Sequence, residues 1–168
     1  MSLNIHKNNS TGLAVSHYDS DNIYPILPLL SEEFPNWTID KIKNYVQLVI
    51  TKKHDVAGML VVRNESLYNV GLLIYTFQSM SSKYLYEKRK KNELIYVLVV
   101  ENLISSSPIL KQQVFLTIVE SAIEVAKKNK CKYIELPRLD ENYKLISKKY
   151  KKEIIKINSF RTLIELKV

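Results

Sequence analysis

The sequence predicts an α/β protein with a mixed, mostly antiparallel sheet, and three observations support this fold class. Residues 94–104 form a long apolar run, followed by a short loop, a helical pattern ending near Asn129 and a second apolar run at 133–136. A strand, a helix and a strand in this order form a βαβ unit with parallel strands. Two other pairs of strand-like runs are each joined by a short polar connection, which predicts antiparallel hairpins.

Length and composition fit one folded domain. The chain has 168 residues, of which 46% are hydrophobic, so it is long enough to bury a core. Residues 1–11 are polar and are expected to be disordered or frayed, which leaves 12–168 as the predicted domain. The polar N-terminus and the lack of a long apolar run predict a cytoplasmic protein without a membrane segment. The single cysteine, Cys131, excludes an internal disulfide and fits a reducing compartment.

The formal net charge of +8 favours anionic partners. Much of it comes from lysine-rich clusters at 88–91, 127–132 and 148–152. Lysines at loops and helix ends also serve solubility, and no aromatic residues are interleaved with them on a recognition element, so nucleic-acid binding is not expected. The three histidines are far apart and have no cysteine partners, so no metal site is expected.

The first part of the chain contains one strand and two helices. Residues 12–18 can form a strand, and the segment Asp19–Asn22 supplies side-chain oxygens suited to capping the next helix. The helix in 23–34 should be short or bent because it contains two prolines. Thr38 is expected to cap the second helix. The buried face of that helix is predicted to consist of Ile39, Ile42, Tyr45, Val46, Val49 and Ile50.

The rest of the chain adds two hairpins around the βαβ unit. Strand-like runs at 56–63 and 67–77 predict the first hairpin, and residues 78–92 are expected to form a mobile, exposed loop. The helix of the βαβ unit has a predicted buried stripe of Phe115, Ile118, Val119, Ala122 and Ala126. The last predicted elements are a helix from Asp140 to about Tyr150 and strands at 153–158 and 160–166.

The resulting order, β-α-α-β-β-β-α-β-α-β-β, resembles that of the GCN5-related N-acetyltransferase (GNAT) family over residues 12–168. The phrase HDVAGMLVV at 54–62 is similar to the family's second strand, of the type x-x-I-V-G-x-x-x-V. The phrase SAIEVAKKNKCKYIEL at 121–136 is similar to its third helix and fifth strand, of the type L-x-x-x-A-x-x-x-G-C-x-x-I-x-L. The resemblance implies transfer of an acetyl group from acetyl-CoA to an amine that attacks the thioester directly, so catalysis consists mostly of positioning.

The resemblance also implies that the cofactor's pyrophosphate binds the turn before the third helix, where N–H groups and the helix dipole favour an anion. The family pattern there is R/Q-x-x-G-x-G/A. Counting back from Cys131 places it on six residues that include no glycine: Leu110, Lys111, Gln112, Gln113, Val114 and Phe115. Further cofactor contacts implied by the resemblance are Leu103, Ile104 and Ser105 before the turn and Asn142 and Tyr143 in the last helix.

Three explanations of the missing glycines stay open. The register of the helix could differ by several residues, so that the serines at 105–107 and Lys111 supply the phosphate contacts. The site could bind CoA in a looser way, with the bulky Phe115 standing where a small residue is usual. Alternatively, the domain has kept the fold and lost the cofactor.

Glu101 is the candidate general base. A base must take the proton of the ammonium before the amine can attack. Alternation along 94–104 places Glu101 on the same face as Val97 and Val99, where a carboxylate is unusual. In the family the corresponding strand carries a bulge beside the acetyl group and often a base carboxylate. The alternative is that the bulge turns Glu101 out to solvent.

Tyr150 is the candidate general acid. It lies about where the family pattern N-x-x-A-x-x-x-Y has the tyrosine that protonates the leaving thiolate. Asn142 is eight residues before it rather than seven, and Tyr143 is an alternative on the same helix face. A tyrosine on an amphipathic helix also commonly packs with its hydroxyl at the surface.

The combined interpretation is an acetyl-CoA-dependent N-acetyltransferase acting on an amine of a small molecule or a protein. The alternative is a non-catalytic GNAT-like binding or regulatory module that has lost CoA binding. The expected partners are acetyl-CoA, as a co-substrate, and an amine acceptor, without a metal. Both a monomer and a homodimer are compatible with the sequence.

Overall fold

The structure, a computed structural model, describes residues 4–8, 12–81, 94–106, 110–137, 140–157 and 160–167. Within these ranges the chain forms eight strands and four helices. In order they are β1 (Asn4–Asn8), β2 (Leu13–His17), α1 (Leu27–Glu33), α2 (Ile39–Ile50), β3 (Ala57–Arg63), β4 (Asn69–Ser81), β5 (Leu94–Ser105), α3 (Lys111–Lys128), β6 (Tyr133–Pro137), α4 (Asp140–Lys149), β7 (Ile154–Ile157) and β8 (Arg161–Glu165).

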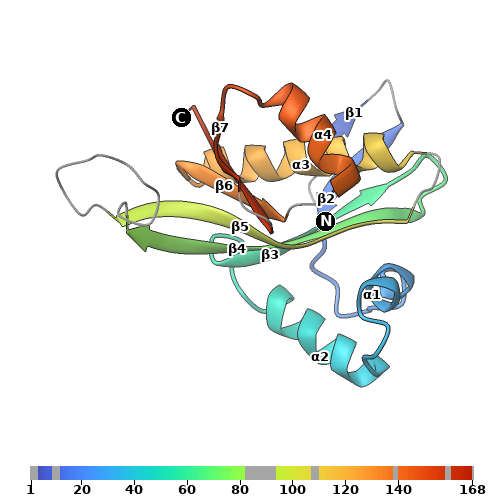
Figure 1. Ribbon diagram of the computed structural model, residues 1–168. Coiled ribbons are helices and arrows are strands. Elements are labelled where there is room, and N and C mark those ends of the chain that lie inside the picture. The colour runs from blue at the N-terminus through green and yellow to red at the C-terminus, as the bar shows by residue number, and fades with distance from the viewer. Residues whose placement is uncertain are drawn as a thin grey trace.

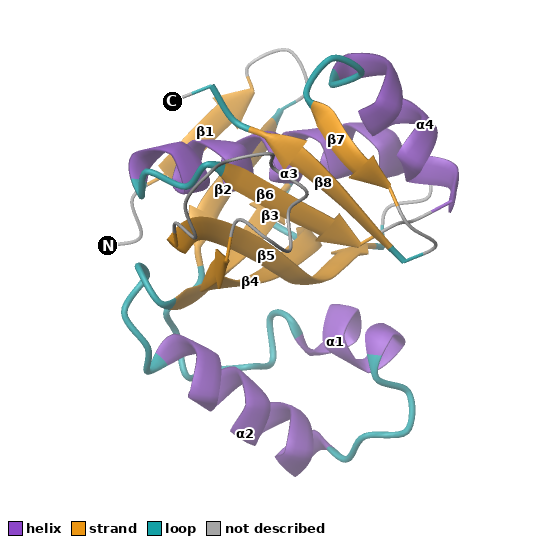
Figure 2. Ribbon diagram, turned by 60° about the vertical axis from the view of Figure 1, so that its left-hand side comes forward, coloured by secondary structure: helices purple, strands orange, loops and turns teal. Residues whose placement is uncertain are grey.

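The described strands form one mixed sheet in the order β1-β2-β3-β4-β5-β6-β8-β7. All neighbouring strands are antiparallel except β5 and β6, which are parallel and joined through α3. Helices α1 and α2 lie on one face of the sheet, and α3 and α4 on the other (Figure 1; Figure 2). The predicted fold class, the βαβ unit and both hairpins are confirmed.

The N-terminal segment differs from the prediction. Residues 4–8, which were expected to be frayed, form β1 and pair antiparallel with β2. Pairing with an existing strand satisfies backbone groups without any apolar side chain, so a polar composition does not rule it out. The prediction of a frayed terminus was therefore wrong for these five residues.

Two large hydrophobic cores lie on opposite faces of the sheet, and a smaller third cluster consists of Ile95, Val97, Val99, Tyr133 and Leu163. One core lies under α3 and α4 and includes every residue of the predicted buried stripe of α3, each no more than 3% exposed. The other lies under α1 and α2 and includes Leu30, Ile42, Val46 and Ile74. The sheet is therefore covered by helices on both faces, as expected for this layer architecture.

The first two helices confirm some local predictions and correct others. Helix α1 has only seven residues, and its N-cap, Ile26, has no side-chain cap. The segment Asp19–Asn22 does not cap it, because Asn22 Oδ1 instead accepts the N–H of Tyr24 at 3.2 Å. Thr38 caps α2 by accepting the N–H of Lys41 at 3.3 Å, as predicted.

The buried face of α2 is narrower than predicted. Ile42, Val46 and Val49 are buried, but Ile39 is 54% exposed. Ile39 is the first helical residue, so it precedes the turn that packs on the sheet. None of the helices in the described ranges is long and apolar enough to cross a membrane. The loop expected at 78–92 lies outside the described residues from 82 onward, and β4 extends to Ser81.

Candidate active site

The two parallel strands, β5 and β6, pair over a short distance and then separate. Their register ends at the pair Val99–Glu135. Strand β5 nevertheless continues to Ser105, paired on its other side with β4. The described backbone therefore opens between β5 and β6 beyond Val99, and β5 offers an edge there that no described strand of the sheet occupies.

A β-bulge lies at this opening. The pairing of β5 with β4 passes from Val100 to Asn102, so Glu101 is an extra residue. Glu101 Oε1 accepts a hydrogen bond from Thr76 Oγ1 at 2.9 Å, and the Glu101 side chain is 34% exposed. Because Thr76 is paired with Val99, Glu101 lies on the face of Val99, as alternation predicted. The bulge does not turn Glu101 out to solvent.

Arg161, at the start of β8, connects the two separating strands. Its Nη1 donates to the carbonyl oxygen of Val100 at 2.8 Å. Its Nη2 lies 3.8 Å from Glu101 Oε2, and its Nε lies 3.4 Å from Glu135 Oε1. The guanidinium therefore stands between a carboxylate of β5 and a carboxylate of β6.

The sequence interpretation did not identify Arg161, Thr76 or Glu135. The available signal was weak: Glu135 is a carboxylate inside the short apolar strand YIELP, and Arg161 is a charge at the start of a strand. Either pattern also fits a solvated edge residue, so neither identified a site residue. The order of the strands in the sheet brings these side chains to Glu101.

The residue after the bulge links it to α1 and α2. Asn102 Oδ1 accepts from the Tyr45 hydroxyl at 3.1 Å, and Asn102 Nδ2 donates to Glu33 Oε1 at 3.1 Å. Burial raises the pKa of Tyr45 above its ordinary value, and the charges of Glu101 and Glu33 raise it further. The Tyr45 hydroxyl therefore keeps its proton at neutral pH and stays a donor to Asn102.

Aromatic rings stand beside these polar groups at the corner between α1 and α2. The rings of Phe34 and Trp37 stack with centroids 4.3 Å apart, and Tyr45 meets both at an edge. The Lys41 ammonium lies 4.2 Å from the Trp37 ring centroid. This face of the opening thus combines carboxylates with aromatic surface.

The turn before α3 lies on the opposite face of the sheet. Helix α3 begins at Lys111, and the first helical bond that involves its N-cap runs from the Val114 N–H to the Leu110 carbonyl at 2.8 Å. The N–H groups of the first turn point out of the helix end and have no acceptor within the helix. The side chains of Lys111, Gln112 and Gln113 are exposed.

Val114 and Phe115 do not belong to this exposed turn. Val114 is fully buried and Phe115 is 3% exposed, and both lie in the core under α3. Their role as cofactor contacts stays a prediction and would rest on their backbone, because both side chains face the sheet. The Phe115 ring consequently does not stand at the exposed end of the helix.

A close approach between sheet and helix sets this arrangement. A Cβ on Gly71 would lie 2.5 Å from Val114 Cγ1, so only glycine lets the first turn of α3 pack this closely. Ser105 is paired with Gly71 and therefore lies on the same face, beneath the start of α3. Its hydroxyl oxygen is buried and has no hydrogen-bond partner in the described structure.

The other predicted cofactor residues lie on β5, α3 and α4. Leu103 and Ile104 are buried in the two different cores, so only their backbone edge could contact a ligand. Asn142 and Tyr143 lie in α4, and their side chains fall outside what the structure describes. Ser105, Leu110, Lys111, Gln112 and Gln113 lie at or next to the start of α3.

Tyr150 comes directly after α4 and packs, half-buried, against the core under α3. Burial raises the pKa of its hydroxyl, and the charge of Glu153 raises it further. Tyr150 therefore lies on the face of the sheet opposite to the carboxylate of Glu101. The two candidate catalytic residues therefore lie on opposite faces of the sheet.

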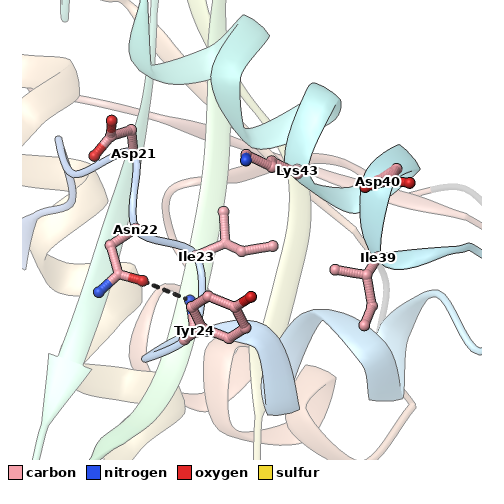
Figure 3. A pocket seen from close by; sticks show the side chains of 7 residues that line it. All are labelled: Asp21, Asn22, Ile23, Tyr24, Ile39, Asp40 and Lys43. Atoms are coloured by element: carbon pink, nitrogen blue, oxygen red, sulfur yellow. Dashed lines mark hydrogen bonds between the residues drawn. The ribbon is translucent and has the colours of Figure 1, made fainter.

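A separate hollow of about 280 Å³ lies between the segment before α1 and the start of α2 (Figure 3). The Asn22–Tyr24 hydrogen bond lies at its edge. Its lining consists of Asp21, Asn22, Ile23, Tyr24, Ile39, Asp40 and Lys43. None of these is a predicted catalytic or cofactor residue, so this hollow is distinct from the candidate active site.

No protein-family model and no curated protein matches the sequence. Solved structures share the fold. A Trypanosoma brucei acetyltransferase matches with a TM-score of 0.58 and 13% identity, covering 81% of this chain and 89% of its own. An aminoglycoside antibiotic 6'-N-acetyltransferase from Acinetobacter baumannii matches with a TM-score of 0.60 and 14% identity, covering 94% and 98%.

A chain of the NatC complex bound to Gag peptide and CoA matches with a TM-score of 0.61 and 11% identity, covering 92% of this chain and 99% of its own. These identities are too low to carry over substrates or residue roles, but the coverage spans nearly the whole architecture. The fold of this chain is that of the GCN5-related N-acetyltransferases.

Proposed function

We propose that this protein is an acetyl-CoA-dependent N-acetyltransferase acting on an amine of a small molecule or a protein. The observation that carries the proposal is the opening between β5 and β6, which has different chemistry on its two faces. On the side of α1 and α2 it presents the Glu101 carboxylate. On the side of α3 it presents a helix start and the buried hydroxyl of Ser105.

The residues at the helix start fit a pyrophosphate. The N–H groups of the first turn and the helix dipole favour an anion. Lys111 adds a positive charge, and the side chains of Gln112 and Gln113 add amide donors. The Ser105 hydroxyl has no partner in the described structure and would gain one.

The rest of the proposed cofactor site extends along the β5 edge and α4. Leu103 and Ile104 would contribute backbone groups, and Leu110 would contribute the backbone of the N-cap. Asn142 and Tyr143 would contribute from α4. From Val100 to Ser105 the edge covers five residue steps, roughly 16 Å at about 3.3 Å per residue, which suits an extended pantetheine arm between the helix start and the bulge.

Acetyl-CoA, when bound, supplies a thioester carbonyl that an amine can attack. Glu101, held by Thr76 and Arg161, would take a proton from the bound ammonium. The Tyr150 hydroxyl, which burial keeps protonated, would give a proton to the departing thiolate. Amine and thioester would meet in the opening from opposite faces of the sheet, so most of the catalysis would be positioning.

The second candidate is a non-catalytic binding or regulatory module. The observation that favours it is the start of α3, where Leu110 and the three residues after it include no glycine. Without glycine the backbone approaches a pyrophosphate less closely. This candidate predicts no affinity for CoA.

Calorimetric titration of the whole protein with acetyl-CoA, and with CoA alone, tests the proposal. We expect a micromolar Kd for acetyl-CoA, and no binding up to millimolar cofactor would favour the non-catalytic module. Release of the CoA thiol is then measured with n-butylamine, 1,4-diaminobutane, an aminoglycoside and a peptide with a free N-terminus. Glu101→Gln should lose turnover while keeping the Kd for acetyl-CoA. Glu124→Gln, at an exposed carboxylate of α3, is the control.

A further inference from the structure

We infer that Arg161 is a positioning residue for acetyl transfer, acting through Glu101; this inference rests on the function proposed above. Its role is to hold the Glu101 carboxylate and the backbone before the bulge in one arrangement at the opening between β5 and β6. Arg161 does not itself touch the reacting atoms.

The sheet order makes the position of Arg161 unusual. Strand β8 lies beyond β6 from β5, so β8 and β5 are not neighbours. Arg161 is paired with Pro137, the last residue of β6. Its side chain therefore reaches β5 past the end of β6 and donates to the Val100 carbonyl at 2.8 Å.

Arg161 and Thr76 contact different oxygens of the Glu101 carboxylate. One carboxylate oxygen, Oε1, accepts from the Thr76 hydroxyl at 2.9 Å. The other, Oε2, lies 3.8 Å from the guanidinium. A carboxylate held at both oxygens has fewer accessible rotamers than one held at a single oxygen, so its direction into the opening is better defined.

Glu135 contacts the same guanidinium from the other strand. Its carboxylate lies 3.4 Å from Arg161 Nε, on the strand that leaves β5 at this point. Without the guanidinium, two partly buried carboxylates would face each other across the opening and repel. A lysine at position 161 could balance the charge. Its single ammonium could not contact the Val100 carbonyl, Glu101 and Glu135 together, as the planar guanidinium does.

A double-mutant cycle separates this role from a purely structural one. The variants are Arg161→Met, Arg161→Lys, Glu101→Gln and the combination of Arg161→Met with Glu101→Gln. Arg63→Met is the matched control, because Arg63 is also a strand arginine of intermediate exposure and donates to Asn69 Oδ1 at 3.2 Å, away from the opening. For each we would measure the Kd for acetyl-CoA, the thermal midpoint, and kcat with the fastest amine of the panel above.

We expect Arg161→Met to lower kcat about 10–100-fold, because small displacements of a reacting group lower rates by factors of this size. The Kd for acetyl-CoA should change by less than about threefold. Arg161→Lys should recover part of the loss, and Arg63→Met should leave kcat unchanged. In the Glu101→Gln background, Arg161→Met should lower kcat no further. The double variant should also lose less of its thermal midpoint than the sum of the losses measured for Arg161→Met and Glu101→Gln alone.

Other outcomes overturn the inference in distinguishable ways. If Arg161→Met lowers kcat by the same factor with and without Glu101, or leaves kcat unchanged, Arg161 does not act through Glu101. If Arg161→Met does not fold, the same comparison with Arg161→Lys decides. If the wild-type protein binds no acetyl-CoA or acetylates none of the amines, the proposed function fails and this inference fails with it.

Discussion

We predict that His17 makes the folded protein less stable in mild acid. The His17 ring, at the end of β2, stacks on His54 with centroids 4.0 Å apart and planes inclined by 11°. Its Nδ1 is buried and has no partner in the described structure. Burial lowers the pKa of His17 from its ordinary 6.5 to about 4, and the neighbouring His54 and Lys128 lower it, while Asp19 and a hydrogen bond with the Met59 backbone act in the opposite direction.

The direction of the effect is set by proton binding. Between pH 6.5 and about 4, His17 binds a proton in the unfolded chain but not in the folded protein. The free energy of unfolding therefore falls as the pH drops through this range, and His17 adds no further loss below pH 4. The difference between 6.5 and about 4 sets an upper limit of about 3 kcal/mol, and because His17 is only partly buried we expect about 1–2 kcal/mol.

Urea unfolding at several pH values between 7.5 and 4 measures this loss. His17→Phe keeps an aromatic ring on His54 and removes the titrating group, so the variant should lose about 1–2 kcal/mol less than the wild type over this range. The comparison is made as a difference between the two proteins, since carboxylates contribute equally to both. Parallel pH profiles for the wild type and the variant would refute the assignment of this acid sensitivity to His17.

Three other predictions concern packing and a buried thiol. Gly71→Ala places a Cβ 2.5 Å from Val114 Cγ1. It should lower the free energy of unfolding by about 1–3 kcal/mol and weaken acetyl-CoA binding. An unchanged urea midpoint would contradict the close packing of α3. Thr162→Val removes a buried hydroxyl that has no partner in the described structure. The variant should be more stable than the wild type by about 1 kcal/mol, and Thr162→Ser is the control. A destabilised valine variant would mean that the hydroxyl is bonded. Burial raises the pKa of the Cys131 thiol to about 11. A thiol reagent should therefore react with it slowly in the folded protein at pH 7 and quickly in urea. Fast reaction of the folded protein would show that the thiol is accessible.

The fold was predictable because its signals are local. The apolar run at 94–104, the helical spacing before Asn129 and the cap at Thr38 each depend on residues close together in sequence, and the structure confirms the strand, the helix and the cap. The errors came where local signals are ambiguous. A polar strand such as β1 has no apolar pattern, and the oxygens of Asp19–Asn22 can form a turn as readily as a helix cap.

The candidate site was predictable only in part. Glu101 stood out because a carboxylate is unusual in an apolar strand, and the bulge that presents it was expected from the resemblance. Phe115 could not be placed from sequence, because its spacing fits both the buried stripe of α3 and the turn before it. The packing of Val114 against Gly71 decides the register and sends Phe115 into the core.

By itself, the sequence determined the order and kind of the elements from β2 onward, because hydrophobic periodicity and turn residues act over a few positions. Tertiary structure alone decided the polar group around the bulge. Arg161 and Val100 are 61 positions apart, and they meet only because β8 pairs with β6 and carries Arg161 to its end. Contacts of this kind depend on which strands become neighbours in the sheet, and no local pattern of residues encodes that order.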